Sequence, residues 1–571
     1  MTAVFLLISS ALIRVIWPRI KPDIHWICPV LSFALPFAAG GFHTATAAVL
    51  SLFLTCALLE QIHQNGTLCF WWNKHSVSIL LLFAAYCVTP LWAADKGMSV
   101  FALTRYLPPV LYMLLAMQLK DDIGEQILHL IPWCGCLMVI AASSALLFPV
   151  LSGHVTIYGR LAGFFQYPNS FAAFLLVGLM VQSFHMTRKT DILLTLILVV
   201  GIVLSGSKTV FVLMTLFMVA IVLLKRRLVP ALILGAILVL SLLAGFLSDS
   251  LGILYNADRF TDIHASSGTF LVRLLYYRDV LPSILSHPFG IGYMGYPAIE
   301  GTIQTGRYYV SFIHNGFLQL LLEIGWIPSF LLFLSLISTA FSPRTPIKSK
   351  LALLAVLSHC MLDFDLQFGV FWIILLSCVN YSVGKQTLIR SCKLAASVLA
   401  LLTAAVLWLG SGDWLYRMEK PELCLKVVPF HTDALTYQMS VNPDPQQADQ
   451  LADRILRLNA THSLAFSAKA NAAYARGDIQ SMILYKENAI AHARYTTAEY
   501  CDYFQKLYTA MQVYLKSGDT GSATYCREKL LKIPQMMEAV SQSTHILANM
   551  TGDDSSLSLP QEYSALLRQL Q

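Results

Sequence analysis

Long apolar segments recur through the first 411 residues of this 571-residue chain, and they constrain its fold more than any other feature. A helix needs about 20 mostly apolar residues to cross a bilayer, or fewer where neighbouring helices shelter it. The segments that we interpret as spans are 26–39, 42–62, 77–94, 98–119, 123–151, 169–185, 192–204, 208–224, 229–247, 314–341, 351–366, 369–384 and 394–409. Only 12% of the residues are charged, against about a quarter in soluble globular proteins. We therefore predict an all-α, polytopic membrane bundle of about 12–14 transmembrane helices.

Basic residues cluster in short turns between these apolar segments. The clusters at 188–189, 225–227, 344–350 and 385–393 all fall on one side of the membrane if the spans alternate, and that side is predicted to be the cytoplasm. No basic and aromatic surface typical of nucleic-acid binding is visible. The prediction is a multi-pass membrane protein whose basic turns face the cytoplasm. Residues 1–17 contain Arg14 and no cleavage site, so they form either a short extra span or an interfacial helix rather than a signal peptide.

The opposite, extracytoplasmic side then receives most of the hydrophilic chain. We expect residues 1–411 to form the transmembrane domain, with a large outer loop at 248–313, and residues 412–571 to form an extracytoplasmic helical domain. Within the latter, segments 470–491 and 510–534 each contain a Gly-Asp turn between two helical patterns, which resembles a tetratricopeptide repeat. Such a domain either binds a protein partner or is a helical cap without a ligand.

The twelve cysteines show no paired spacing typical of zinc ligands, so no metal site is predicted. Most of them lie in apolar segments, as small core residues do. Cys501 and Cys526 fall on neighbouring predicted helices outside the cell, where a disulfide is one possibility.

A polar stripe follows the start of the apolar segment 314–341, which we predict to be one membrane helix beginning at the water interface. Asn315, Gln319 and Glu323 are four residues apart and so share a helix face. A carboxylate inside an apolar span is costly, which makes Glu323 either a functional group or part of a polar seam between helices.

Cationic residues occur on the predicted outer side, against the usual charge bias. Arg160, Lys208, Arg273 and Arg278 lie there, and Asn169 is the first polar residue of the span after Arg160. Each one alone is most simply a solvated loop residue, but together they favour an anionic substrate, because guanidinium and ammonium groups both bind phosphate.

Histidines complete the candidate site. His314 precedes the polar stripe, and its side chain titrates in a range suited to accepting a proton from a hydroxyl. His359 and Asp363 are expected one turn apart in the span 351–366, where Asp363 orients His359 or pairs with Lys208, and Asp365 is expected on the other face.

These residues fall in motifs that resemble the O-antigen ligase and O-antigen polymerase family of bacterial membrane glycosyltransferases. The motifs are Arg-x-x-Gly-Phe-x-x-x-Pro-Asn at 160–169, Ser-Gly-Ser-Lys at 205–208, His-Pro-Phe-Gly-Ile-Gly at 287–292 and His-Asn-x-x-Leu-x-x-x-x-Glu-x-Gly at 314–325. The resemblance covers roughly residues 26–384, and the C-terminal helices resemble an extension that some members carry.

The resemblance implies transfer of a glycan from an undecaprenyl-diphosphate carrier to an acceptor hydroxyl, without metal or cofactor. It implies that Lys208 and Arg273 hold the diphosphate and that His314 is the catalytic base or orients the acceptor. This sequence departs from the family at Lys208, where arginine is usual. The positive charge is kept, but the bidentate hydrogen bonding of a guanidinium to the diphosphate is lost. Arg160, Asn169, Arg278 and Asn315 are expected to contact substrate. Glu323, His359 and Asp363 are expected to support the site.

The motifs do not distinguish a polymerase, whose acceptor is a second lipid-linked repeat, from a ligase, whose acceptor is a lipid, polymer or protein. A different class is a non-enzymatic scaffold or a transporter for polysaccharide assembly, with partners bound by the C-terminal repeats. A transporter is disfavoured because the polar residues lie near the outer edge, and no symmetry between halves is visible.

Overall fold

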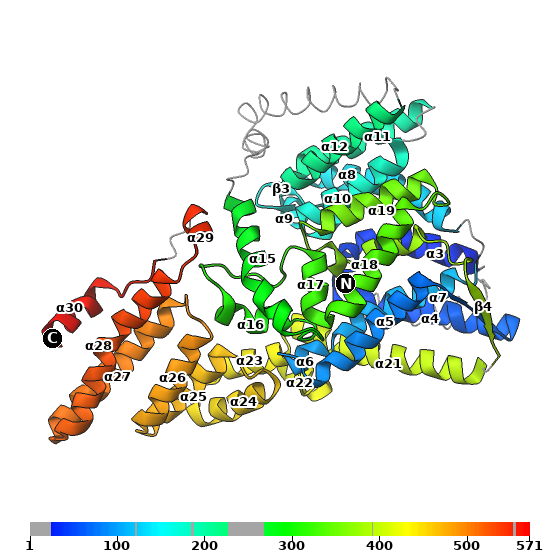
Figure 1. The fold of residues 1–571 in the computed structure, drawn as a ribbon. Coiled ribbons are helices and arrows are strands. Elements are labelled where there is room, and N and C mark those ends of the chain that lie inside the picture. Colours follow the sequence, from blue (N-terminus) through cyan, green and yellow to red (C-terminus); the bar gives the residue numbers. More distant parts are fainter. Residues whose placement is uncertain are drawn as a thin grey trace.

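The computed structural model describes residues 24–119, 123–183, 188–225, 268–390, 392–551 and 556–570. Helices make up most of it, arranged as a membrane bundle with a separate arm of C-terminal helices (Figure 1). Within these described ranges, five helical stretches are long and apolar enough to cross a membrane, namely Thr44–Asn65, Lys74–Leu91, Lys96–Ala116, Ile123–Ala145 and Lys393–Arg417. Four shorter apolar helices accompany them. The all-α polytopic prediction is therefore confirmed, while the predicted elements at 1–17 and 229–247 lie outside the described residues.

The elements of the first half follow the predicted order. They are α3 (Ile24–Ala34), η1 (Leu35–Phe37), η2 (Ala39–Gly41), α4 (Thr44–Asn65), β1 (Leu68–Trp72), α5 (Lys74–Val88), η3 (Thr89–Leu91), α6 (Lys96–Ser99), α7 (Ala102–Ala116), α8 (Ile123–Ala145), α9 (Pro149–Val155), β2 (Thr156–Ile157), β3 (Arg160–Leu161), η4 (Gly163–Phe165), α10 (Pro168–Ser183), α11 (Lys189–Ser205) and α12 (Lys208–Lys225). Capping residues in the sequence determine where several of these helices begin or end. Asn73 caps α5 by accepting from the backbone amides of His75 and Ser76, and Gly66 ends α4 in a left-handed conformation.

The second half completes the bundle. It contains α15 (Gly268–Ser286), α16 (Gly295–Ile303), α17 (Gly316–Ile324), α18 (Trp326–Phe341), α19 (Ile347–Cys360), η5 (Asp365–Gln367), α20 (Gly369–Ser377), β4 (Lys385–Ile389) and α21 (Cys392–Arg417). The described part of the predicted outer loop is thus largely helical. Strands β1 and β4 pair antiparallel, with Phe70 opposite Thr387, and β2 pairs with β3.

The prediction of one continuous helix at 314–341 is wrong, because the helix breaks at Gly325 into α17 and α18. Gly325 has φ +83°, and a Cβ there would lie 2.2 Å from the Pro288 carbonyl oxygen. The His-Pro-Phe-Gly-Ile-Gly segment crosses this break. The Ile291 amide donates to the Leu322 carbonyl at 2.7 Å, and the Trp326 amide donates to the Pro288 carbonyl at 3.0 Å. Backbone from 288–292 therefore satisfies groups that the broken helix leaves unpaired.

The span predicted at 351–366 is also shorter than expected. Helix α19 ends at Cys360, and residues 361–364 turn away before η5. Asp363 consequently lies beyond the helix end instead of one helical turn from His359.

The C-terminal residues form paired helices. They are α22 (Pro421–Val427), α23 (Thr432–Val441), α24 (Pro445–Leu458), α25 (Ser463–Ala475), α26 (Ile479–Ala491), α27 (Thr497–Ser517), α28 (Thr520–Gln542), α29 (Ile546–Met550) and α30 (Gln561–Leu570). The two predicted Gly-Asp turns join α25 to α26 and α27 to α28, with Gly477 and Gly518 at positive φ. Cys501 and Cys526 are free thiols, so the disulfide considered from the sequence is not formed.

Candidate active site

A buried carboxylate, Asp363, is the centre of the candidate site. Its side chain is fully buried, and its Oδ2 lies 3.2 Å from Arg273 Nη2 and accepts from Asn169 Nδ2 at 2.9 Å. Tyr167 donates its hydroxyl to Asp363 Oδ1 at 3.0 Å. Arg273 also donates to the Leu362 carbonyl at 2.6 Å. A buried charge is tolerated when it is paired and hydrogen-bonded in this way, so α10, α15 and the 361–364 turn are held together here.

Arg160 extends the network to the next helix end. Its Nη2 donates to Asn169 Oδ1 at 2.6 Å, and its Nε donates to the Ser205 carbonyl at 2.8 Å. Lys208 begins α12 three residues after Ser205. The structure therefore brings Arg160, Asn169 and Arg273 together, with Lys208 close to the helix end that Arg160 contacts.

His314 lies beside this network in an unusual backbone conformation. Its φ of +53° is rare for a residue with a side chain, and such strain is concentrated at functional sites. Its carbonyl accepts from the Tyr277 hydroxyl at 2.6 Å, and its ring packs edge-on against Phe364 at 5.1 Å. Nδ1 lies 3.0 Å from the Phe312 carbonyl, an acceptor, which assigns the ring proton to Nδ1 and leaves the Nε2 lone pair available.

Asn315 fixes the position of His314 relative to Asp363. The Asn315 side-chain oxygen caps α17 by accepting from the Phe317 and Leu318 amides, and its Nδ2 donates to the Met361 carbonyl at 2.8 Å. Asn315 therefore joins the start of α17 to the turn that carries Asp363.

Glu323 lies deeper in the bundle, fully buried. Its oxygens accept from the Tyr86 hydroxyl at 2.5 Å and from Gln319 Nε2 at 2.7 Å, and Gln319 Oε1 accepts from the Ile313 amide at 2.9 Å. The predicted stripe thus forms a continuous connection that ends beside His314. Glu323 itself contacts the site only through Gln319.

His359 pairs with Asp365, contrary to the expectation that Asp365 lies on the other face. His359 Nδ1 lies 2.5 Å from Asp365 Oδ2, and Ser170 donates to Asp365 Oδ1 at 2.7 Å. All three side chains are buried. The reason is the early end of α19, which lets the chain turn back so that residue 365 faces residue 359. This pair anchors the turn that carries Asp363.

The structure places Arg278 outside this network. Its side chain is 47% exposed and contacts Asp279 at 2.9 Å and Thr305 at 3.0 Å. Conversely, sequence reasoning missed Tyr167 and Asp365 as partners. Tyr167 stands inside the Arg160–Asn169 motif directly before its Pro-Asn step, which is a signal that could have indicated it.

The geometry gathers two guanidinium groups, an amide and an imidazole around one buried carboxylate. Across the ranges that the structure describes, no three His, Cys, Asp or Glu side chains converge as metal ligands would. Such a set of groups is suited to binding an anion and exchanging a proton.

Comparison with known proteins matches one family to this region. The O-antigen ligase family model matches residues 193–334, a segment that contains Lys208, Arg273, His314 and Glu323. No curated protein sequence matches the chain. Residues 193–334 are therefore similar to the O-antigen ligase family and form an O-antigen ligase domain.

Proposed function

We propose that this protein transfers a glycan from an undecaprenyl-diphosphate carrier to an acceptor hydroxyl at the outer face of the cytoplasmic membrane, without a metal ion. The O-antigen ligase domain at residues 193–334 supports a glycan-transferring role in polysaccharide assembly. The observation that carries the finer proposal is the placement of Arg273 and strained His314 around one buried carboxylate, Asp363.

The proposed reaction assigns the proton and the leaving group to different side chains. His314 Nε2 accepts the proton of the acceptor hydroxyl, whose oxygen attacks the anomeric carbon of the carrier-linked sugar. The bond from that carbon to the diphosphate oxygen breaks, and the lipid diphosphate leaves with its charge. Arg273, with Lys208 and Arg160, stabilises that charge, and attack from the opposite face inverts the sugar carbon.

Neighbouring residues keep these groups in place. Asp363 orients Arg273, and Asn169 holds both Asp363 and Arg160. Asn315 and Glu323 position His314 through the Met361 and Gln319 contacts. Arg278 is proposed to contact the acceptor only at the periphery, because its side chain lies outside the network.

Substitution of the two central residues tests the reaction. His314→Ala and Arg273→Ala are expected to abolish glycan transfer while leaving expression and membrane insertion intact, because they remove the proton acceptor and a cation that stabilises the leaving diphosphate. Glycan gels from a deletion strain carrying each variant measure the product. The control is Arg188→Ala, an exposed arginine at the start of α11. Near-normal products from either active-site variant would disprove the assignment.

The same gels separate the remaining alternatives. Loss of long chains with single units still attached indicates a polymerase, whereas loss of every attached glycan indicates a ligase. A non-enzymatic scaffold that acts through the C-terminal helices predicts that residues 412–571 alone restore function. We expect no restoration, because this piece lacks Arg273 and His314.

A further inference from the structure

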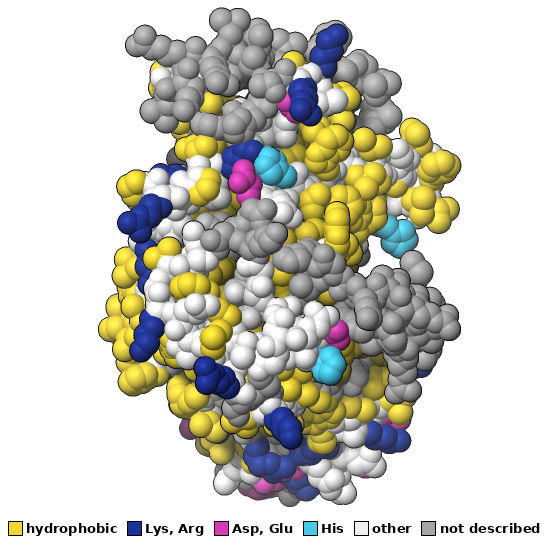
Figure 2. Space-filling model, turned by 90° about the vertical axis from the view of Figure 1, so that its right-hand side faces the viewer, with side chains coloured by type: hydrophobic (Ala, Val, Ile, Leu, Met, Phe, Trp, Pro, Cys, Tyr) yellow, Lys and Arg dark blue, Asp and Glu magenta, His cyan; other side chains and the backbone are white. Residues whose placement is uncertain are grey.

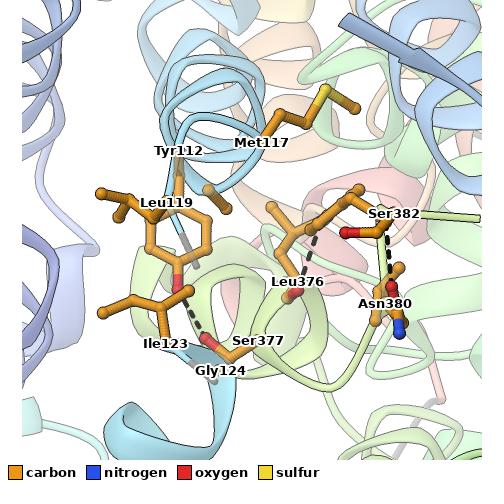
Figure 3. Close-up of a pocket in the computed structure, with 12 residues that line it drawn as sticks. Tyr112, Met117, Leu119, Ile123, Gly124, Leu376, Ser377, Asn380 and Ser382 are labelled. Carbon is orange, nitrogen blue, oxygen red and sulfur yellow. Dashed lines mark hydrogen bonds between the residues drawn. The ribbon is translucent and has the colours of Figure 1, made fainter. Parts of the chain in front are cut away.

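A cavity lies at the end of the bundle where β1 and β4 pair. It measures about 550 Å³ and is lined from β1, α5, α8, the α18–α19 turn and the segment after α20. A neighbouring pocket of about 30 Å³, shown in Figure 3, has room for about one water, beside the Tyr112–Ser377 hydrogen bond of 2.6 Å. Only the larger cavity can therefore accept a chemical group the size of a phosphate.

Positive charge predominates at this cavity. Lys74 and Arg344 line it, and Arg344 has no side-chain hydrogen bond or ion pair to any residue that the structure describes. Glu125 is the one carboxylate among the lining residues, and it is shared with Lys348 at 4.0 Å and His129 at 3.6 Å. Figure 2 shows this end of the molecule, where dark-blue Lys and Arg side chains recur between apolar patches.

A buried polar atom in the cavity wall lacks a partner. His75 is 7% exposed, and its Nε2 lies 3.1 Å from Thr339 Oγ1, while its Nδ1 has no hydrogen-bond partner among the described residues. An unsatisfied buried nitrogen is costly, and this one belongs to a side chain that lines the cavity. Helix α19 also begins here, at Pro346, without a side-chain cap, and helix starts attract anions.

Apolar side chains frame the same opening. Trp72 is 50% exposed and Val383 is 49% exposed in the cavity wall, and Phe341, which directly precedes the lining residue Ser342, is 75% exposed. Exposed tryptophan side chains are typical of the membrane–water interface. A ligand that fits both features carries a negative headgroup and hydrocarbon chains.

We propose that this cavity binds the phosphate of an anionic phospholipid from the leaflet at this end of the bundle, between Lys74, Arg344 and the start of α19. The site is separate from the Asp363 network and does not depend on the transfer reaction.

Native mass spectrometry of the full-length protein tests the site. Dioleoyl phosphatidylglycerol and dioleoyl phosphatidylcholine, which differ in headgroup charge, are titrated separately. The wild type is expected to retain phosphatidylglycerol about tenfold more strongly, and Lys74→Gln with Arg344→Gln to lose that preference. The control Lys189→Gln removes an exposed cation that is not among the cavity residues, and is expected to keep the preference.

Three results would overturn the proposal. They are equal retention of both lipids by the wild type, an unchanged preference in the double Gln variant, and full displacement of phosphatidylglycerol by millimolar inorganic phosphate, which would assign the cavity to free phosphate. The charge-retaining pair Lys74→Arg with Arg344→Lys is expected to keep the preference, and its loss there would show that the double Gln effect is not due to charge.

Discussion

At the scale of single residues, Asp363 determines the geometry of the candidate site. It is buried, and it contacts Arg273, Asn169 and Tyr167 at once. Its importance followed only partly from the sequence, because the expected partner was His359 or Lys208 and the observed charged partner is Arg273. The partner of Asp363 differs because α19 ends at Cys360. The sequence does not indicate this helix end, since no glycine or proline occurs at residues 355–363.

Asp363→Asn is expected to lower glycan transfer about 100-fold, because Arg273 loses the charge that orients it, and small misplacements of a substrate-binding group have effects of that size. The shape of the side chain is kept. Transfer assays on membranes normalised for protein amount measure the effect. Ser170→Ala, which removes one hydrogen bond to Asp365 and leaves Asp363 untouched, is the control. Equal losses in the two variants would contradict the special role of Asp363.

His462 makes one C-terminal helix sensitive to pH. Burial lowers the pKa of His462 from 6.5 to about 4, and its Nδ1 accepts from the Ala465 amide at the start of α25. The unfolded chain takes up a proton below pH 6.5 while folded His462 stays neutral, so stability is complete above pH 6.5 and falls as the pH drops toward 4.

Hydrogen exchange, corrected for intrinsic rates, is expected to show protection of residues 463–475 declining between pH 6.5 and 4. His462→Asn keeps a capping side chain without a titrating ring, so its protection should not change over that window. A decline of the same size in both proteins would assign the effect to another group.

At the scale of elements, the apolar segments and the paired C-terminal helices with their Gly-Asp turns were predictable, because hydrophobicity and turn residues are local signals. The break between α17 and α18 was not. It depends on residues 288–292, which are distant in sequence and supply backbone hydrogen bonds to the broken end. Gly290 and Gly325 are part of the recognised motifs, but they are needed because each lies against the backbone of the other segment, a contact that a single sequence does not display.

Gly325→Ala is expected to destabilise the protein by more than about 3 kcal/mol, because the residue has positive φ and its new methyl group would overlap the Pro288 carbonyl. Gly477→Ala is the matched control. Gly477 also has positive φ, at +75°, but nothing lies within 4 Å of the added carbon, so the cost should be about 1 kcal/mol. Thermal unfolding of both variants in detergent measures the difference, and equal shifts would contradict the steric argument.

At the scale of the whole molecule, the C-terminal helices are attached to the membrane bundle through buried polar contacts. Asp95 is 5% exposed and caps α6 by accepting from the Met98 amide. It also accepts from Thr432 Oγ1 at 2.8 Å and from Asn459 Nδ2 at 3.3 Å. One carboxylate therefore links the bundle to both α23 and the end of α24.

Asp95→Ala is expected to increase limited proteolysis and hydrogen exchange at residues 421–458, because two hydrogen bonds that cross between the parts are lost together with the α6 cap. Asp444→Ala removes a carboxylate of similar capping role at the start of α24, where it contacts the Gln446 amide. That control should loosen α24 alone. If both variants expose the same region to the same extent, Asp95 does not join the two parts.

Residues 288–292 cross the end of α17. This contact limits which sequence segments can be swapped between related proteins to make a chimera. Gly290 and Gly325 each leave room for the other segment's backbone, so neither segment keeps its conformation without its partner. A chimera that replaces residues 288–292 but keeps the native α17 would bring together two backbone segments that do not fit each other. Residues 288–326, which contain both sides of this contact, are therefore expected to need transfer together.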